Sequence, residues 1–282
     1  MDIFVTGATS GIGRDAAKAF AEKGHRVFAA GRNEQALREL EAEHGIVGVV
    51  LDVTKQESID AAFELVSEKT GGRGVDVLVN NAGYATAGAI VDMDEAVLRA
   101  QFDTNVFGLV AMTKKFAEPM LVRRSGRVVN VGSVSGRIPA PLLGAYHATK
   151  YALEALNDAM RMEMKAFGVD VVMVEPGTIK TGFAKRTMSE ASAMKTSATR
   201  SRFAPAYAEM DAIESKFASL ASSTKHTTRA LLHAALARRP CTRYVAPWRF
   251  WAVIALVQLA PTRLLDAIAR ATFGLTRAKL DA

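Results

Sequence analysis

Cysteine is nearly absent from this chain of 282 residues, which contains only Cys241. No disulfide can form within the chain, which excludes the disulfide-stabilised folds of small secreted proteins. A single cysteine far from any other motif is expected to be structural. The first residues also lack the basic start of a signal peptide. We therefore expect the protein in a reducing compartment, the cytoplasm.

Long hydrophobic runs are missing as well. The most apolar stretch has 13 residues between Arg249 and Arg263, and Pro261 interrupts it. Because a membrane-spanning helix needs about 20 apolar residues, we expect no membrane span. We also expect no metal site and no nucleic-acid partner.

Acidic residues are scarce only in the last third of the chain. The net charge is +7. Residues 1–179 carry 19 basic and 23 acidic side chains, residues 180–239 carry 11 and 4, and residues 240–282 carry 6 and 2. A solvated basic face explains this excess most simply. An anionic partner or a membrane surface is the alternative.

What the chain does contain is a regular alternation of short apolar runs and longer amphipathic stretches up to about residue 175. Runs rich in valine or isoleucine predict strands buried on both faces. They lie at residues 3–6, 26–30, 47–51, 75–79, 127–131 and 170–174, with a last candidate at 243–246. Helical patterns separate them, for example at 13–23, 34–43 and 58–69. The alternation predicts a parallel sheet with helices on both faces, in a single doubly wound α/β domain.

A glycine-rich turn follows the first predicted strand. Its residues, 6–13, read Thr-Gly-Ala-Thr-Ser-Gly-Ile-Gly and lead directly into a helix. Such a turn lets the backbone approach the pyrophosphate of a dinucleotide, which rests on the helix N-terminus. The candidate cofactor contacts here are Gly7, Thr9, Ser10, Gly11, Ile12 and Gly13. A plain glycine-rich turn remains the alternative.

The end of the second predicted strand indicates which dinucleotide is bound. NAD sites usually have an acidic residue there that binds the ribose 2′-hydroxyl. This chain has Arg32 instead, which can bind a 2′-phosphate. We therefore expect NADP(H) to be preferred over NAD(H), unless Arg32 only points into solvent.

Other candidate cofactor contacts follow later strands, where ligands bind in open α/β sheets. Asp52 and Val53 end the third strand. The fourth strand ends in Asn-Asn-Ala-Gly, and the sixth is followed by Pro-Gly-Thr-Ile-Lys-Thr. From these two motifs the candidates are Asn80, Ala82, Gly83, Pro176, Gly177, Ile179 and Thr181. Asn80 and its neighbour could instead bind only the backbone at a strand end.

Tyr146 and Lys150 stand four residues apart, so on a helix both side chains lie on one face. A lysine ammonium nearby favours the tyrosinate and lowers the pKa of the phenol from its usual value of about 10. A phenol with such a pKa can exchange a proton with an alcohol or a carbonyl.

Together these motifs resemble the short-chain dehydrogenase/reductase family in its TGxxxGxG form, from about residue 2 to residue 182. The resemblance implies a sheet of about seven strands in the order 3-2-1-4-5-6-7. It also implies a catalytic set of Asn105, Ser133, Tyr146 and Lys150. Ser133 lies thirteen residues before Tyr146, as the family spacing requires, although Ser135 is close by. Tyr146 and Lys150 are also expected to contact the cofactor.

The resemblance assigns a role to each member of this set. Ser133 would orient the substrate oxygen, Tyr146 would exchange the proton, and Lys150 would lower the pKa of the tyrosine and bind the nicotinamide ribose. Asn105 would hold a water that links Lys150 to solvent.

Residues 183–225 are the natural segment to cover a substrate, within a catalytic domain of residues 1–246. The segment contributes apolar side chains that suit a bulky, hydrophobic substrate, although ordinary helix packing would also explain them. They are Phe183, Met188, Met194, Phe203, Tyr207, Met210 and Phe217.

Residues 247–282 form a basic C-terminal extension with two tryptophans and an amphipathic helix expected at 262–273. The extension could lie on a membrane surface, or pack over the substrate cleft or a subunit interface. The family resemblance further implies a homodimer or homotetramer, with contacts around residues 94–118 and 146–166.

The leading functional hypothesis is an NADP(H)-dependent oxidoreductase for a hydrophobic alcohol and its ketone or aldehyde, such as a steroid, retinoid or other lipid. A 3-oxoacyl-carrier-protein reductase is the alternative within the enzyme class. A non-catalytic NADP(H)-sensing scaffold is the alternative outside it.

Overall fold

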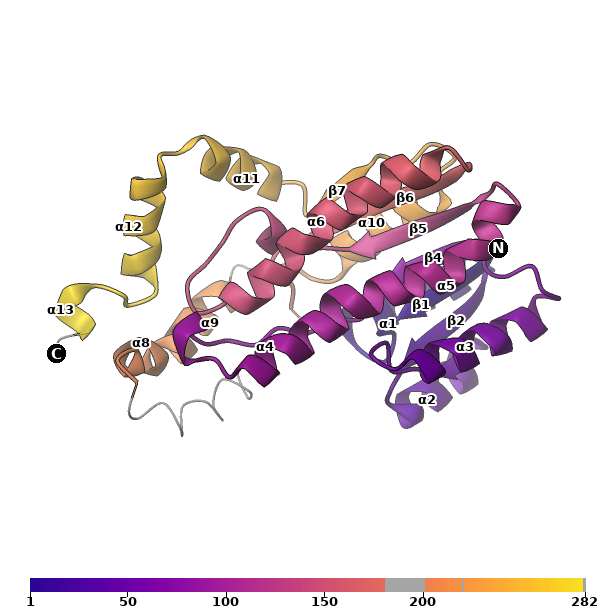
Figure 1. The fold of residues 1–282 in the computed structure, drawn as a ribbon, viewed down its shortest axis with the longest axis horizontal. Helices are drawn as coiled ribbons and strands as arrows, with labels where there is room; N and C mark the ends of the chain where they lie inside the picture. Colours follow the sequence, from indigo (N-terminus) through magenta and orange to yellow (C-terminus); the bar gives the residue numbers. More distant parts are fainter. Residues whose placement is uncertain (181–200, 220, 281–282) are drawn as a thin grey trace.

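The computed structural model describes residues 1–180, 201–219 and 221–280. Its centre is a parallel sheet of seven strands in the order β3-β2-β1-β4-β5-β6-β7 (Figure 1). In chain order the strands are β1 (Asp2–Thr6), β2 (Arg26–Gly31), β3 (Val47–Val50), β4 (Val77–Asn80), β5 (Gly126–Val131), β6 (Val169–Pro176) and β7 (Arg243–Ala246). The predicted doubly wound sheet and its strand order are confirmed.

Alternate residues of the central strand face two separate cores, because side chains along a strand point to opposite faces. Ile3 and Val5 of β1 belong to one core, and Phe4 belongs to the other. The first core is closed by α1 (Gly11–Glu22), α2 (Glu34–His44) and α10 (Lys225–Leu236). The second is closed by α3 (Gln56–Lys69), α5 (Gly108–Val122) and α6 (Gly144–Lys165).

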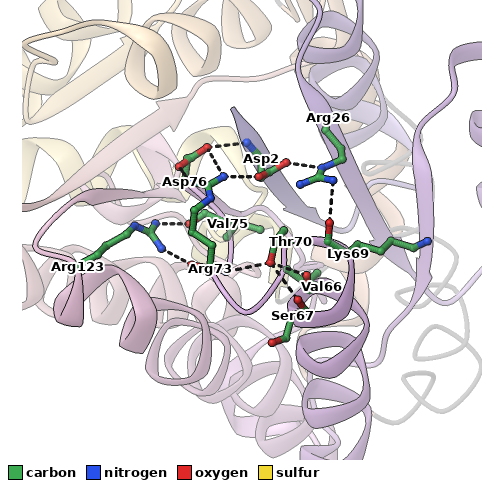
Figure 2. A network of polar contacts seen from close by, with 11 residues as sticks. Asp2, Arg26, Val66, Ser67, Lys69, Thr70, Arg73, Val75, Asp76 and Arg123 are labelled. Carbon is green, nitrogen blue, oxygen red and sulfur yellow. Dashed lines mark hydrogen bonds and ion pairs between the residues drawn. The ribbon is translucent and has the colours of Figure 1, made fainter.

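A network of charged groups joins the amino-terminal ends of β1, β2 and β4 (Figure 2). The backbone N–H of Asp2 donates to Asp76 Oδ2 at 2.8 Å, and Arg73 forms ion pairs with both carboxylates. Burial alone would raise the pKa of Asp2, but its ion pairs with Arg26 and Arg73 lower it. The network holds the edge of the sheet opposite the strand ends that carry the predicted site.

Strand β4 starts two residues later than the predicted run at 75–79. The carbonyl of Val75 accepts a hydrogen bond from Arg123 Nη2 at 2.5 Å, within the network of Figure 2. The apolar pattern had assigned Val75 to the strand, but its carbonyl group bonds to the side chain of Arg123, which lies far along the sequence.

After β6 the chain builds small helices beside the carboxyl edge of the sheet. They are α8 (Ala204–Ala208), α9 (Met210–Ser219), α11 (Phe250–Leu259), α12 (Thr262–Thr272) and α13 (Arg277–Leu280). The amphipathic helix expected at 262–273 is α12. Within residues 1–180, 201–219 and 221–280, no helix is both long enough and apolar enough to cross a membrane.

Three short turns complete the elements near the site. The 3₁₀ turns η1 (Ile90–Asp92) and η3 (Val134–Gly136) lie in loops after β4 and β5. Between α4 (Glu95–Phe102) and α5 the chain forms a π-helical turn, η2 (Asp103–Phe107). Such turns often mark functional positions in helices.

Candidate active site

The glycine-rich turn between β1 and α1 is built for close backbone contact. Gly7 and Gly11 have φ angles of +64° and +53°, a region that glycine adopts without steric cost. A Cβ on Gly13 would lie 2.4 Å from the carbonyl oxygen of Gly7, so any side chain there would force the turn open. Ser10 is exposed at the N-cap of α1. The turn thus presents the start of a helix to the carboxyl edge of the sheet, a geometry that fits a pyrophosphate.

The end of β4 fixes this turn in place. The hydroxyl oxygen of Thr6 accepts hydrogen bonds from the backbone N–H groups of Asn81 and Ala82, both at 2.9 Å. The side-chain nitrogen of Asn81 donates to the carbonyl oxygens of Thr6 and Gly7, at 2.9 and 3.1 Å. Asn81 belongs to the Asn-Asn-Ala-Gly motif and binds backbone at a strand end, the alternative that the sequence left open for these asparagines. Its role is to hold the glycine-rich turn against β4.

Asn80 points the other way. Its side chain is buried and donates to Thr113 Oγ1 and Asn130 Oδ1, both at 2.9 Å. Its amide nitrogen is therefore used inside the protein, between β4, α5 and β5. Its amide oxygen Oδ1 is buried and has no hydrogen-bond partner among the described residues.

The ends of β2 and β3 hold the residues predicted to select the cofactor. Arg32 is exposed directly after β2, and Thr9 packs so closely on Gly31 that a Cβ there would lie 2.6 Å from Thr9 Cγ2. Asp52 Oδ1 accepts hydrogen bonds from Thr54 N and Oγ1. Burial raises the pKa of Asp52, but these bonds and the charge of Arg32 lower it overall. The ends of β2 and β3 thus present the cation of Arg32, while the carboxylate of Asp52 is already hydrogen-bonded within its own turn, to Thr54.

Val53 and Gly83 line the turns that follow β3 and β4. Val53 is buried, and its Cγ2 would be 2.8 Å from a Cβ on Gly108 at the start of α5. A Cβ on Gly83 would lie 3.1 Å from Asn105 Oδ1. Both contacts show that small residues keep these turns close to the helices beside them.

Tyr146, Lys150 and Ser133 meet where β5, α6 and β6 come together. Lys150 Nζ donates to the carbonyl oxygen of Val131 at 2.9 Å and lies 5.8 Å from the centre of the Tyr146 ring. Ser133 Oγ accepts from the backbone N–H of Ser135 at 3.1 Å and donates to the carbonyl oxygen of Pro176 at 3.4 Å. Ser133 is buried, and Ser135 serves as the donor that orients it.

Burial dominates the titration of this pair. It raises the pKa of Tyr146 to about 12, although a hydrogen bond with the Ser133 side chain acts in the opposite direction. It lowers the pKa of Lys150 to about 8, against the opposing charge of Glu154. The expected lowering of the tyrosine pKa is thus wrong for this structure, because desolvation by burial outweighs the hydrogen bond with Ser133. A phenol that keeps its proton at neutral pH suits proton donation.

Asn105 lies in the π-helical turn η2 and is buried. Its amide nitrogen donates to the carbonyl oxygen of Tyr84 at 2.8 Å and to Thr149 Oγ1 at 3.0 Å, while its oxygen accepts from Tyr84 N at 3.0 Å. Thr149 in turn donates to the carbonyl oxygen of Tyr146 at 2.7 Å. The side chain therefore ties the loop after β4 to the first turns of α6. Both of its amide hydrogens are used within the protein.

The motif after β6 meets the C-terminal extension. The backbone N–H of Gly177 donates to the carbonyl oxygen of Ala246 at 2.9 Å, and a Cβ on Gly177 would lie 2.2 Å from the ring of Phe250. Ile179 forms a single parallel bridge with Ser222. Thr181 lies outside the described residues.

A third buried cluster lies beside the segment that precedes Tyr146. Three of the residues predicted to cover a substrate belong to it, and Phe273 of the extension joins them. Its buried members include Leu142, Tyr207, Met210 and Phe273, and the partly buried Phe203 packs against them. The Tyr207 hydroxyl accepts from Ala89 N at 2.9 Å and donates to Asp92 Oδ2 at 2.8 Å.

The other covering candidates cannot be placed in this cluster. Phe183, Met188 and Met194 lie outside the described residues, as does the side chain of Phe217. The part of the covering segment that is described packs, together with Phe273, next to the loop that leads to Tyr146.

The sheet order, the glycine-rich turn and the grouped tyrosine, lysine and serine define an α/β protein of the dinucleotide-binding class. A family model described as short chain dehydrogenase matches residues 2–192. The chain belongs to the short-chain dehydrogenase/reductase family.

Relatives of known name extend this assignment. The NADPH-dependent 3-dehydrocapnine reductase of Ornithobacterium rhinotracheale is 31% identical over 270 residues, which cover 94% of each chain. Retinol dehydrogenase 7 of Rattus norvegicus is 33% identical over 278 residues, covering 94% of this chain and 86% of the relative.

A solved structure supports the same fold. A short chain dehydrogenase/reductase from Burkholderia phymatum, in complex with NAD, has a TM-score of 0.77 and 25% identity, with coverage of 90% of this chain and 92% of that one. Some curated relatives match only in part: the chain spans 61% and 58% of the length of two that align over 190 residues.

Proposed function

We propose that the protein is an NADP(H)-dependent oxidoreductase that interconverts a hydrophobic alcohol and its ketone or aldehyde. The observation that carries this proposal is the meeting of Tyr146, Lys150 and Ser133 at the sheet edge that also carries the glycine-rich turn. An acid, an adjacent cation and a hydroxyl donor at such an edge suit proton transfer to a carbonyl oxygen.

The residues of the glycine-rich turn would hold the dinucleotide phosphates, with Arg32 at the adenosine end and Lys150 at the nicotinamide ribose. When bound, the cofactor supplies or accepts the hydride. Ser133 orients the substrate oxygen. Tyr146 donates its proton to that oxygen in reduction and takes it back in oxidation. Asn105 keeps α6 in register with the loop after β4, so its effect on the reaction is through position.

The preference for NADP(H) is supported by charge at the end of β2. Arg32 is exposed at the position where NAD sites usually have a carboxylate. Asp52, the nearby acid, is bound to Thr54 in its own turn. A 2′-phosphate would therefore meet a guanidinium first. The NADPH dependence in the name of the 3-dehydrocapnine reductase is consistent with this choice.

A hydrophobic substrate is supported by the cluster of Leu142, Phe203, Tyr207, Met210 and Phe273 beside the Tyr146 loop. Retinol, named in one relative, is a molecule of this class. We propose a cytoplasmic homo-oligomer whose catalytic domain is residues 1–246, followed by a basic C-terminal extension, residues 247–282.

The subunit contact we propose runs along α4, α5 and α6. Phe107 is 61% exposed, Tyr151 42% and Met162 64%, all on these helices or the turn between them. Large apolar side chains that remain exposed on neighbouring helices suit a dimer interface.

The test is the variant Tyr146→Phe, assayed with NADPH and NADH against a panel of ketones, aldehydes and alcohols. Loss of the phenolic proton should lower turnover by about 10² to 10⁴, the usual range for general acid catalysis. NADPH binding, followed by fluorescence, should stay near the wild-type value because the ring is retained. Tyr151→Phe, on the same helix but exposed, is the matched control and should turn over normally. Full activity of Tyr146→Phe would refute the mechanism.

A further inference from the structure

The C-terminal arm, residues 247–280, exposes an unusual amount of apolar surface. Trp248 is 79% exposed, Leu256 69% and Leu259 85% in and before α11, while Leu264 is 53% and Ile268 55% exposed in α12. No residue of α12 is buried, and Ile254 is the only buried residue of α11. The two helices therefore do not use their apolar faces to cover the body of the protein.

The arm is nevertheless fixed at both ends. At its start the ring of Phe250 lies on Gly177, and Arg249 Nη2 donates to Ser222 Oγ at 2.8 Å. At its far end Phe273 is buried in the cluster that contains Leu142. Figure 1 shows α11 and α12 standing away from the sheet between these attachments and meeting at an angle, with α13 returning towards α8. The apolar faces are held in a defined place and are not a loose tail.

A helix that is apolar on all sides is normally buried. The ten residues of α11 include no charged side chain. Burial of large apolar side chains stabilises a protein, and an apolar helix left in water lacks that stabilisation. Contiguous exposed apolar patches of this kind mark interaction sites. The sequence allows three arrangements for the extension: on a membrane surface, over the substrate cleft or at a subunit interface. Packing over the protein's own cleft accounts only for the two ends of the arm.

The charges around these faces identify the partner. Around α11 and α12 the sequence carries three basic residues, Arg249, Arg263 and Arg270, and one acidic residue, Asp266. Arg249 and Arg263 bracket α11, and a tryptophan lies at its start. Aromatic rings and cations beside apolar helix faces match the boundary of an anionic lipid layer. At about 1.5 Å per residue, α11 is only about 15 Å long, so it can lie in a membrane surface and not span it.

We propose that α11 and α12 dock this protein on an anionic lipid leaflet. The Phe273 end of the arm adjoins the cluster beside the Tyr146 loop, so docking would bring that side of the protein to the membrane. If the proposed function holds, a carbonyl or alcohol dissolved in the leaflet would reach the site without crossing bulk water. Docking itself depends only on the arm.

The experiment measures binding of the full chain to vesicles. Half phosphatidylglycerol and half phosphatidylcholine vesicles are compared with pure phosphatidylcholine vesicles by flotation. The double variant Leu256→Glu/Leu259→Glu places two charges on the exposed face of α11. Val122→Glu is the matched control, because Val122 is 76% exposed but lies at the end of α5. We expect at least a tenfold loss of binding for the double variant, none for the control, and a similar loss for the wild type in pure phosphatidylcholine or in about 0.5 M salt.

Three results would overturn docking: no wild-type binding to anionic vesicles, equal binding by the double variant, or a dimer that the double variant converts to monomer without lipid. The last result would assign the face to a second copy of the chain. Turnover of a short water-soluble ketone, without vesicles, separates the two proposals. If neither protein reduces any ketone, the proposed function fails while the binding result stands. If both proteins reduce the soluble ketone but only the wild type reduces a long-chain ketone faster when it is dissolved in vesicles, delivery from the leaflet is supported. An equal increase in turnover for both proteins would refute delivery.

Discussion

Replacing Glu154 by glutamine should move the pH range in which the protein is active. Glu154 lies one helical turn after Lys150 on α6, and its negative charge raises the pKa of the lysine against the larger effect of burial. The carboxylate is held by Arg243, which also pairs with Glu175 and Asp158. Burial and Glu175 raise the pKa of Glu154 to about 7, although Arg243 and Arg137 oppose them. Between about pH 7 and pH 8, Glu154 is therefore largely ionised while Lys150 is still largely protonated.

The size of the effect follows from the spacing. Two unit charges about 6 Å apart, at an effective dielectric constant of about 20, interact by about 3 kcal/mol, which is roughly two pKa units. Because Glu154 is only partly ionised near neutral pH, we expect about one unit. Lys150 has a pKa of about 8 with the carboxylate present, so it should lose its proton near pH 7 in the variant. If the reaction needs the protonated Lys150, its rate should fall as the pH is raised, and this fall should begin at a lower pH in the variant than in the wild type.

The assay is the pH profile of kcat for ketone reduction between about pH 6 and 9.5, together with the pH dependence of NADPH affinity measured by fluorescence. Asp158→Asn is the matched control, because Asp158 pairs with the same arginine at 2.7 Å but lies a further turn from Lys150. The control should keep the wild-type midpoint. Equal profiles for all three proteins, or equal shifts in both variants, would refute an effect of Glu154 on the lysine.

Three further predictions concern the cofactor site and the sheet edge. Arg32→Asp should weaken NADPH binding at least tenfold more than NADH binding in fluorescence titrations; equal losses would contradict the phosphate contact. Gly13→Ala should reduce affinity for both cofactors at least tenfold and lower stability by about 1–3 kcal/mol, because its Cβ would lie 2.4 Å from the Gly7 oxygen; unchanged Tm and affinity would refute this. Arg73→Met should lower stability in urea unfolding by about 1 kcal/mol at pH 7 without changing turnover. Since the pKa of Asp2 is lowered in the fold, this difference should be present above the unfolded value of about 3.9 and vanish in acid; a loss that persists at pH 2 would contradict the ion pairs.

The architecture could be predicted because it depends on local patterns. Each strand is a short run that contains valine, and each glycine motif follows a strand. The apolar period and the turn residues therefore agree with the final sheet. The family resemblance added the strand order. The boundaries shifted where a distant side chain bonded to the backbone, as Arg123 does at Val75.

The partners that sequence reasoning could not assign are all contacts between distant segments. Asn81 binds the glycine-rich turn 74 and 75 residues away, and Tyr207 reaches Asp92 across 115 residues. Phe273 shares a core with Leu142 although nothing in its own neighbourhood indicates that partner. The direction of the Tyr146 pKa shift was missed for a related reason, because spacing on a helix gives the charge of a neighbour but not the degree of burial.

The contact of Phe250 with Gly177 has a consequence for variation in this protein. The phenylalanine ring occupies the space that any side chain at position 177 would need. A substitution at a predicted cofactor contact would therefore displace the first turn of the arm, and a larger residue at 177 could be accommodated only together with a smaller one at 250. Sequence change at the two positions should be paired, and the arm should be inherited with the catalytic domain as one unit.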